Sequence, residues 1–243
     1  MGEVISVLSG KGGTGKTTLC ALIATCMAAE GKKVLCIDAD VGLRNLDIAL
    51  GMASLPVVAF TDVLDGHYTL ADAALHPRLS DLSLFTAPLR EEPIDPERFG
   101  RMLRQAREEF DYCLIDAPAG LGPMFRLASR NADRCLLIST PDPASLRDAA
   151  RTADILSLDG KTEVRLIINR VSPRMFSRME LTVDDVMDSV GLPLLGLVPE
   201  DHNVMLAAAE DEALIFAADR GAAEAGLRIA RRLCGRPMPL MKL

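Results

Sequence analysis

Residues 10–18 have the clearest potential for chemistry, because they read Gly-Lys-Gly-Gly-Thr-Gly-Lys-Thr-Thr and fit the pattern G-x-x-x-x-G-K-[ST]. An apolar run, Val4–Leu8, precedes them and a helical pattern follows. Glycines let the backbone curl so that successive N–H groups point at a phosphate chain, and a helix N-terminus adds partial positive charge. We therefore predict a phosphate-binding loop in which Lys16 neutralises the β- and γ-phosphates of a nucleotide and the Thr17 hydroxyl binds Mg²⁺. The residues predicted to contact the nucleotide from this loop are Gly10, Lys11, Gly12, Gly13, Thr14, Gly15, Lys16, Thr17 and Thr18.

Two apolar runs end in carboxylates that could hold this Mg²⁺. One run ends at Asp116 and is followed by Ala-Pro-Ala-Gly, and the other ends at Asp38, two residues before Asp40. A single acid at the end of a strand is more often a solvated terminus or a helix cap. Beside a phosphate-binding loop, however, such a carboxylate is placed to hold Mg²⁺. We predict that Asp116 and Asp38 bind the metal, both through water.

The identity of the base can be argued from one segment. The N-K-x-D motif of guanine-binding proteins uses its carboxylate to accept hydrogen bonds from two guanine N–H groups. Here the corresponding segment, residues 169–172, reads Asn-Arg-Val-Ser, so serine stands where that carboxylate would be. This favours ATP, with the Asn169 amide able to contact adenine. The alternative is that Asn169 is only a turn residue.

Seven short apolar runs must position these groups. They recur at intervals of about 20–35 residues and do not alternate with polar residues, which is typical of strands buried on both faces of a parallel sheet. The helical patterns between them predict an α/β fold, a P-loop NTPase three-layer α/β/α sandwich with a mostly parallel sheet of about seven or eight strands. The runs are Val4–Leu8, Val34–Ile37, Leu82–Phe85, Tyr112–Ile115, Cys135–Ile138, Val164–Ile168 and Leu194–Val198.

Two of the intervening helices have clear ends. A helix is predicted over Thr17–Glu30, closed by Gly31, and another begins at Pro96 after the capping residue Asp95. The second helix also carries an arginine at every third position from 98 to 107, either a solvated face or a surface for an anionic partner. We expect one domain over residues 1–243. Residues 236–243 form a short tail that can be disordered, because it contains two prolines and is too short for an independent helix.

Composition excludes several classes of protein. The chain has 243 residues, a net charge of −7, 49 % hydrophobic residues and no Trp, which excludes a largely disordered chain and argues against indiscriminate binding to nucleic acid. No apolar run is long enough to span a membrane, and the first residues lack the pattern of a secretory signal. The six cysteines form no C-x-x-C pair, so we expect buried thiols rather than a metal or iron–sulfur site.

The second lysine of the loop, Lys11, gives the form K-G-G-T-G-K-T-T, which resembles the deviant Walker A ATPases of the MinD/ParA family. Residues 37–47, Ile-Asp-Ala-Asp-Val-Gly-Leu-Arg-Asn-Leu-Asp, resemble switch I of the MinD branch, and Asp116–Gly120 resembles its Walker B and switch II segment. Leu146–Asp148, Asn169–Arg170 and Val198–Asp201 are similar to later motifs of the family. The resemblance covers roughly residues 3–235.

The resemblance implies a mechanism for this chain. ATP would bring two subunits face to face as a homodimer, with Lys11 reaching the partner's phosphates and Asp40 positioning or activating the attacking water. Together with Lys16 these residues would form the catalytic set for slow hydrolysis of ATP to ADP, stimulated by a protein partner. The residues that the resemblance places against adenine are Asn169, Arg170, Pro199, Glu200 and Asp201.

The resemblance also implies a cellular role, the placement of the division septum or of another polar structure such as a flagellum. The alternative is a ParA-like ATPase that binds DNA non-specifically in chromosome or plasmid partition, for which the Arg98–Arg107 stripe is the candidate surface. An iron–sulfur carrier is the third class. The expected location is the cytoplasm. A peripheral position on the inner membrane face stays open, because residues 226–235 have the pattern of a core-facing helix rather than of the amphipathic anchor of MinD proteins.

Overall fold

A single β-sheet positions the predicted site. The computed structural model describes residues 1–41, 44–90 and 93–241, and within these ranges eight strands lie in the order β3-β4-β2-β5-β1-β6-β7-β8. Every neighbouring pair is parallel except β3 with β4. This arrangement confirms the predicted α/β fold. The strands are β1 (Glu3–Leu8), β2 (Val34–Asp38), β3 (Ala74–His76), β4 (Leu79–Phe85), β5 (Tyr112–Asp116), β6 (Arg134–Ser139), β7 (Val164–Val171) and β8 (Leu194–Pro199).

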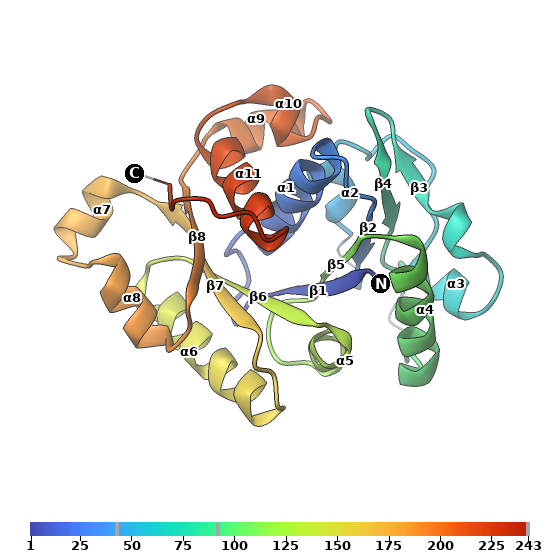
Figure 1. Ribbon diagram of the computed structural model, residues 1–243, viewed down its shortest axis with the longest axis horizontal. Coiled ribbons are helices and arrows are strands. Elements are labelled where there is room, and N and C mark those ends of the chain that lie inside the picture. The colour runs from blue at the N-terminus through green and yellow to red at the C-terminus, as the bar shows by residue number, and fades with distance from the viewer. Residues whose placement is uncertain (42–43, 91–92, 242–243) are drawn as a thin grey trace.

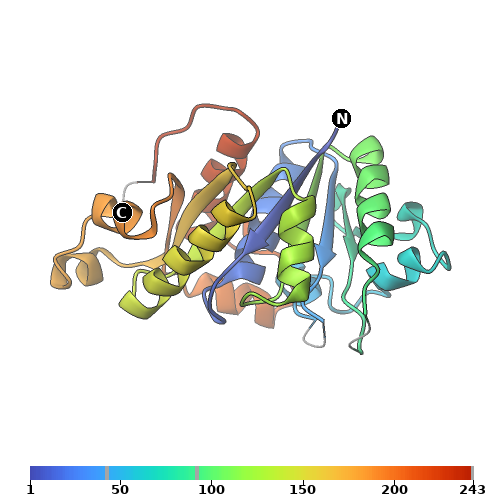
Figure 2. The same ribbon diagram turned by 90° about the horizontal axis from the view of Figure 1, so that it is seen from below.

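Helices cover both faces of the sheet, as Figures 1 and 2 show. Each face has its own apolar core, because alternate residues of the central strands point to opposite sides. None of the described helices is long and apolar enough to cross a membrane. One face carries α1 (Lys16–Ala29), α2 (Leu46–Leu50), α9 (Asn203–Ala209), α10 (Leu214–Ala217) and α11 (Ala222–Leu233). The other carries α3 (Phe60–Leu64), α4 (Pro96–Glu109), α5 (Pro123–Asn131), α6 (Pro143–Leu158), α7 (Pro173–Arg178) and α8 (Val183–Val190).

Helix α1 is buried on almost all sides, because it packs on the sheet with α11 along one flank and α2 along the other (Figure 1). Its sequence is correspondingly apolar around the whole circumference rather than along one stripe. The two helices approach closely at Gly226 of α11, where an added Cβ would lie only 2.3 Å from Cγ of the buried Leu22. The phosphate-binding loop that precedes α1 is therefore attached to one of the most enclosed elements of the protein.

Replacing Gly226 by valine is expected to lower the free energy of unfolding by about 1–3 kcal/mol, because the new methyl groups overpack the α1–α11 contact. Valine gains only roughly 0.5 kcal/mol over glycine in helix propensity, so overpacking decides the sign. Chemical denaturation measures the change. The control is Ser157→Val on the exposed face of α6, which we expect to change stability by less than about 0.5 kcal/mol. Equal stability of Gly226→Val and wild type would contradict this packing.

The C-terminal helix presents its apolar side to the core, as its pattern predicts. Ile229, Ala230 and Leu233 are buried against α1 and β8. On the other side, both Arg231 and Arg236 pair with one carboxylate, Glu30 at the end of α1. Between α11 and Met241 the described residues form neither helix nor strand. The described part of the predicted tail, residues 236–241, still contacts the body, since Arg228 donates to the Pro239 carbonyl at 3.4 Å. Residues 242–243 lie outside the described ranges.

Replacing Glu30 by glutamine is expected to remove a pH-dependent part of the stability. The hydrogen bond from Arg231 lowers the pKa of the Glu30 carboxyl. The contribution of ionised Glu30 to the stability of the fold is therefore fully present above pH 4.5, the ordinary pKa of the carboxyl. It is lost as the pH falls through the lower pKa that Glu30 has in the folded protein. We expect Glu30→Gln to lose about 0.5–1 kcal/mol at pH 7 and nothing near the acid limit, measured by urea unfolding at both pH values. An equal loss at both would contradict the ion pair.

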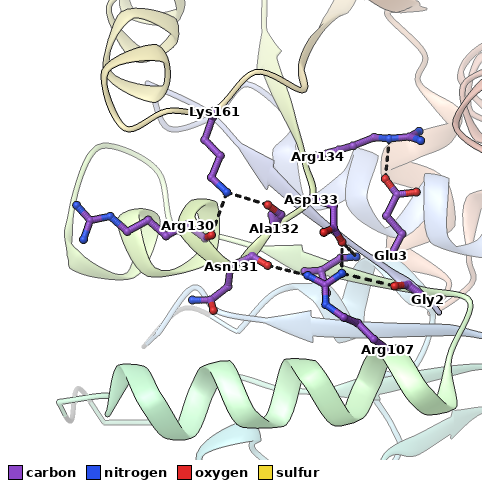
Figure 3. A network of polar contacts seen from close by, with 10 residues as sticks. Gly2, Glu3, Arg107, Arg130, Asn131, Ala132, Asp133, Arg134 and Lys161 are labelled. Carbon is purple, nitrogen blue, oxygen red and sulfur yellow. Dashed lines mark hydrogen bonds and ion pairs between the residues drawn. The ribbon is translucent and has the colours of Figure 1, made fainter.

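The amino ends of the central strands are tied together by a separate polar network (Figure 3). Arg107 at the end of α4 donates to the Asp133 carboxylate and, at 3.1 Å, to the Asn131 carbonyl. Asp133 also accepts from the Val4 backbone N–H at 2.8 Å.

At the start of α4, Arg98 pairs with Asp65. Both ends of the predicted arginine stripe thus take part in the fold, which favours a solvated structural face.

The cysteines follow the prediction of buried thiols. Five of them are buried and Cys234 is partly buried, and all six are free. Burial raises the pKa of the Cys26 thiol to about 12 and that of Cys135 to about 11, so both stay protonated at neutral pH. They pack as small apolar side chains.

Candidate functional site

The predicted phosphate-binding loop connects β1 to α1 at the carboxyl edge of the sheet. Gly13 and Gly15 have φ values of +81° and +88°, in the left-handed region that favours glycine. Gly10 is required for another reason, since a Cβ there would lie 2.6 Å from the Asp148 carbonyl oxygen of α6. The loop therefore needs glycine both for its curl and for its close contact with α6.

The centre of the site is a buried lysine between two carboxylates. Strands β2, β5 and β1 are neighbours, so their ends bring Asp40 and Asp116 to the loop. The Lys16 ammonium donates to Asp116 Oδ1 at 2.6 Å and lies 3.9 Å from Asp40 Oδ2. The Lys16 and Asp116 side chains are only 6 % and 0 % exposed. Burial raises the pKa of Asp116, and the adjacent Lys16 charge opposes this rise.

The chemistry of these side chains fits Mg²⁺. Asp116 Oδ2 is buried and has no hydrogen-bond partner among the described residues, and the nearby Thr17 side chain lowers the pKa of the same carboxyl, against the larger effect of burial. Carboxylate and hydroxyl oxygens are the ligands that Mg²⁺ prefers, and the ion usually keeps water and phosphate oxygens as its other ligands. No group of three or more His, Cys, Asp or Glu side chains gathers to hold a metal in the part of the chain that the structure describes. Thr17 and Asp116 fit a Mg²⁺ ion whose other ligands are water and nucleotide phosphates.

Asp38 has a role that its position in the sequence did not reveal. Its carboxylate is fully buried and accepts three backbone N–H bonds, from Asp40 at 3.0 Å and from Asn45 and Leu46 at 3.1 Å each. Asp38 thus fixes the position of Asp40 and holds the start of α2. Burial and then the nearby Asp116 raise the pKa of Asp38 to about 6. Its water-mediated contact with metal stays a prediction.

The second lysine of the loop lies apart from this centre. Lys11 Nζ is 3.7 Å from Asp142 Oδ1, and both side chains are 46 % exposed. Asp142 caps the start of α6, where it accepts from the Ser145 N–H at 3.0 Å, and a hydrogen bond from Thr140 lowers its pKa. The Lys11 ammonium at the tip of the loop is therefore accessible to another molecule.

The predicted base-binding residues gather beside the loop. Strands β7 and β8 are neighbours, so Asn169 and Pro199 both reach a cavity of about 230 Å³ next to Gly15 and Thr18. The sequence did not single out α9, which follows β8 and adds apolar side chains to this cavity; its only signal was a short apolar run. The other lining residues are Leu19, Leu22, Arg170, Val198, Glu200, Asp201, His202, Val204, Met205 and Ala222.

Two of these residues have further structural roles. Arg170 adopts φ +55°, a conformation uncommon outside glycine, and lines both this cavity and a second one of about 310 Å³ beside Lys11. The Asp201 carboxylate accepts backbone N–H bonds from Asn203 and Ala222, each at 2.9 Å. Asp201 therefore holds the starts of α9 and α11. It also forms part of the cavity wall.

Comparison with known proteins identifies similar chains. A family model for the CobQ/CobB/MinD/ParA nucleotide binding domain matches residues 5–215. The septum site-determining protein MinD of Synechocystis is 36 % identical over 248 residues, which cover 99 % of this chain and 92 % of that protein.

Solved structures show the same similarity. A chain of the MinC:MinD cell division protein complex of Aquifex aeolicus superposes with a TM-score of 0.92 at 36 % identity, covering 99 % and 98 % of the two chains. The septum site-determining protein MinD of Pyrococcus horikoshii complexed with Mg-ADP gives a TM-score of 0.83 at 27 % identity, covering 96 % of each chain.

Proposed function

The chain belongs to the family of CobQ/CobB/MinD/ParA nucleotide-binding domains, and we propose that it is a MinD-type ATPase that hydrolyses ATP to ADP and phosphate and forms a homodimer in the ATP state. One observation carries the proposal. Lys16 is held 2.6 Å from Asp116 and 3.9 Å from Asp40 at the start of α1, where the phosphates of a bound nucleotide need a cation and an adjacent carboxylate.

In the proposed reaction, the N–H groups of the loop and the Lys16 ammonium bind the phosphate chain and stabilise the charge that develops on the γ-phosphate. Thr17 and Asp116 would hold Mg²⁺, which would supply further charge neutralisation. Asp40 orients the attacking water. The Asp40 backbone N–H donates to the Asp38 carboxylate, and this hydrogen bond keeps Asp40 in place. Asn169, Arg170 and the segment Pro199–Asp201 surround the adenine.

Dimerisation gives the exposed Lys11 its role. Two bound nucleotides that face each other across a dimer are polyanions, so their approach requires cations at the contact. Lys11 is half-exposed at the loop tip, and its only ion pair among the described residues is the one with Asp142, an exposed pair of a kind that contributes about 0–1 kcal/mol. Its transfer from Asp142 to a partner's phosphate therefore costs little.

The proposed cellular role is the placement of the division septum. It is supported by the relatives of similar length that are named for septum-site determination. The Aquifex structure carries MinD together with MinC, which supports a protein partner for this chain as well. We place the protein in the cytoplasm, with slow hydrolysis that a partner stimulates. Contact with the inner membrane face is tested by sedimentation with anionic liposomes in the presence of ATP or ADP.

Sedimentation velocity with Mg-ATP and with Mg-ADP tests the proposed switch. We expect a dimer with ATP and a monomer with ADP, with phosphate release that is slow in the dimer. A monomer in both nucleotides would refute the switch. ATP-dependent retention on DNA at low salt that disappears near physiological salt would instead identify the ParA-like alternative, because such binding depends on contacts of basic residues with phosphates.

A further inference from the structure

The carbonyl groups on the outer side of the phosphate-binding loop need hydrogen-bond partners. When consecutive N–H groups of a loop turn inward to bind phosphate, the carbonyl groups of the same peptides turn outward into the protein. Thr14 is one of these residues, and it is buried, 3 % exposed. A buried carbonyl needs a partner, since an unpaired polar group away from water destabilises the conformation that leaves it so.

The partner comes from a strand far along the chain. Asn169 Nδ2 donates to the Thr14 carbonyl at 2.8 Å, across a sequence separation of 155 residues. Asn169 is itself buried, 7 % exposed, and it lies where the pairing of β7 with β8 shifts register between Ile168 and Val171. Strand alternation places Asn169 on the same face as Ile167, the face that carries α1, and the register shift that follows coincides with the left-handed conformation of Arg170.

The next residue of the loop fits against the same amide. A Cβ on Gly15 would lie 2.2 Å from Asn169 Nδ2, so the absence of a side chain at Gly15 allows the amide to reach the Thr14 carbonyl. Gly15 also precedes α1, and its own carbonyl accepts the N–H of Leu19 at 2.9 Å. The amide is therefore placed at the joint between the loop and α1.

We propose that Asn169 is a positioning residue for the phosphate-binding loop, and that its amide N–H bond to the Thr14 carbonyl fixes the peptide orientation in which the loop N–H groups face the phosphates. The inference rests on the proposed nucleotide-binding function and extends it. The Asn169 Nδ2 group donates to the loop and the residue also lines the cavity beside it, so one side chain links the base side of the site to its phosphate side.

The test separates action on the phosphates from action on the base. Asn169→Leu keeps the approximate shape and removes the donor without adding charge, and binding is measured for Mg-ATP and for magnesium tripolyphosphate, which has no base. We expect both affinities to fall by a similar factor, about tenfold to a hundredfold. A loss for ATP with unchanged tripolyphosphate binding would overturn the proposal and assign Asn169 to adenine alone. Unchanged binding of both would overturn it as well.

The matched control is Asn131→Leu on α5, where the same amide group donates to the Leu127 carbonyl at 2.9 Å, away from the loop. We expect this variant to bind both ligands as wild type does. If Asn169→Leu does not fold, Asn169→Ala is used, and hydrogen exchange of residues 12–16 in the nucleotide-free protein gives a second measurement. Faster exchange there supports the proposal, and unchanged exchange contradicts it. Failure of the wild-type protein to bind either ligand would refute the proposed function instead.

Discussion

Lys16→Ala is expected to weaken ATP binding by about a hundredfold to several thousandfold, the largest loss of affinity that we expect from a single substitution in the site. The wild-type lysine is almost fully buried and is the only cation that the structure places against Asp116 among the described residues. Without it, the phosphates and the buried carboxylate would face each other uncompensated, and loss of one partner of such a pair costs about 3–5 kcal/mol. Isothermal titration calorimetry with Mg-ATP measures the change.

The same substitution is expected to destabilise the nucleotide-free protein, so a second variant separates folding from binding. In Lys16→Ala/Asp116→Asn the unpaired buried charge is removed, and we expect most of the lost stability to return while ATP binding does not. The control is Lys32→Ala, which changes a partly exposed lysine after α1, and this variant should bind ATP normally. ATP affinity in Lys16→Ala within a factor of ten of wild type would refute the assignment of the phosphate-binding loop.

Asp40→Ala is expected to slow ATP hydrolysis by about a hundredfold to ten-thousandfold while ATP binding and dimerisation persist. Groups that orient or activate the attacking nucleophile contribute rate factors of this size. Binding should persist because Lys16 keeps its closer partner, Asp116 at 2.6 Å, when Asp40 at 3.9 Å is removed. Removal of one negative charge near the phosphates also favours the bound state. Single-turnover phosphate release and sedimentation velocity measure the two properties.

A surface acid distinguishes this effect from a general change in charge. Asp81→Ala removes an exposed carboxylate of β4, and we expect its hydrolysis rate and its ATP-dependent dimer to equal those of wild type. If Asp40→Ala hydrolyses ATP at the wild-type rate, Asp40 does not position the water. If Asp40→Ala stays monomeric with ATP, the residue acts in dimer formation rather than in chemistry.

Local sequence predicted most of the fold, and its errors have physical reasons. The seven predicted strands are present, since buried parallel strands need unbroken apolar runs. Strand β4 begins at Leu79, three residues before the predicted Leu82. Its first residues were missed because they are partly or fully exposed and pair only with β3. Strand β3 itself was missed: it has three residues, and Leu75 at its centre is 61 % exposed. An edge strand this short has no core-facing pattern to detect.

Some site residues were likewise predictable from local sequence and others were not. A loop with this glycine and lysine pattern is recognisable because its curl depends on φ values that glycine adopts locally. Asp142, in contrast, has the sequence pattern of an ordinary helix cap before Pro143, and its position beside Lys11 could not be foreseen. The same holds for α9, whose residues line the cavity beside the loop only because β8 ends there.

Local sequence is enough to identify the groups that can do chemistry: a curled loop that ends at a helix N-terminus, two lysines, and carboxylates at the ends of apolar strands. Those properties depend on neighbouring residues, and neighbouring residues fix backbone conformation and periodicity. Which of these groups meet depends on the packing of the whole chain. Lys16 contacts Asp116 across 100 residues and Thr14 meets Asn169 across 155, because the crossover connections place β5 beside β1 and bring β7 to the same edge of the sheet. The order of strands in a sheet is set by packing over the whole chain, which no local pattern records.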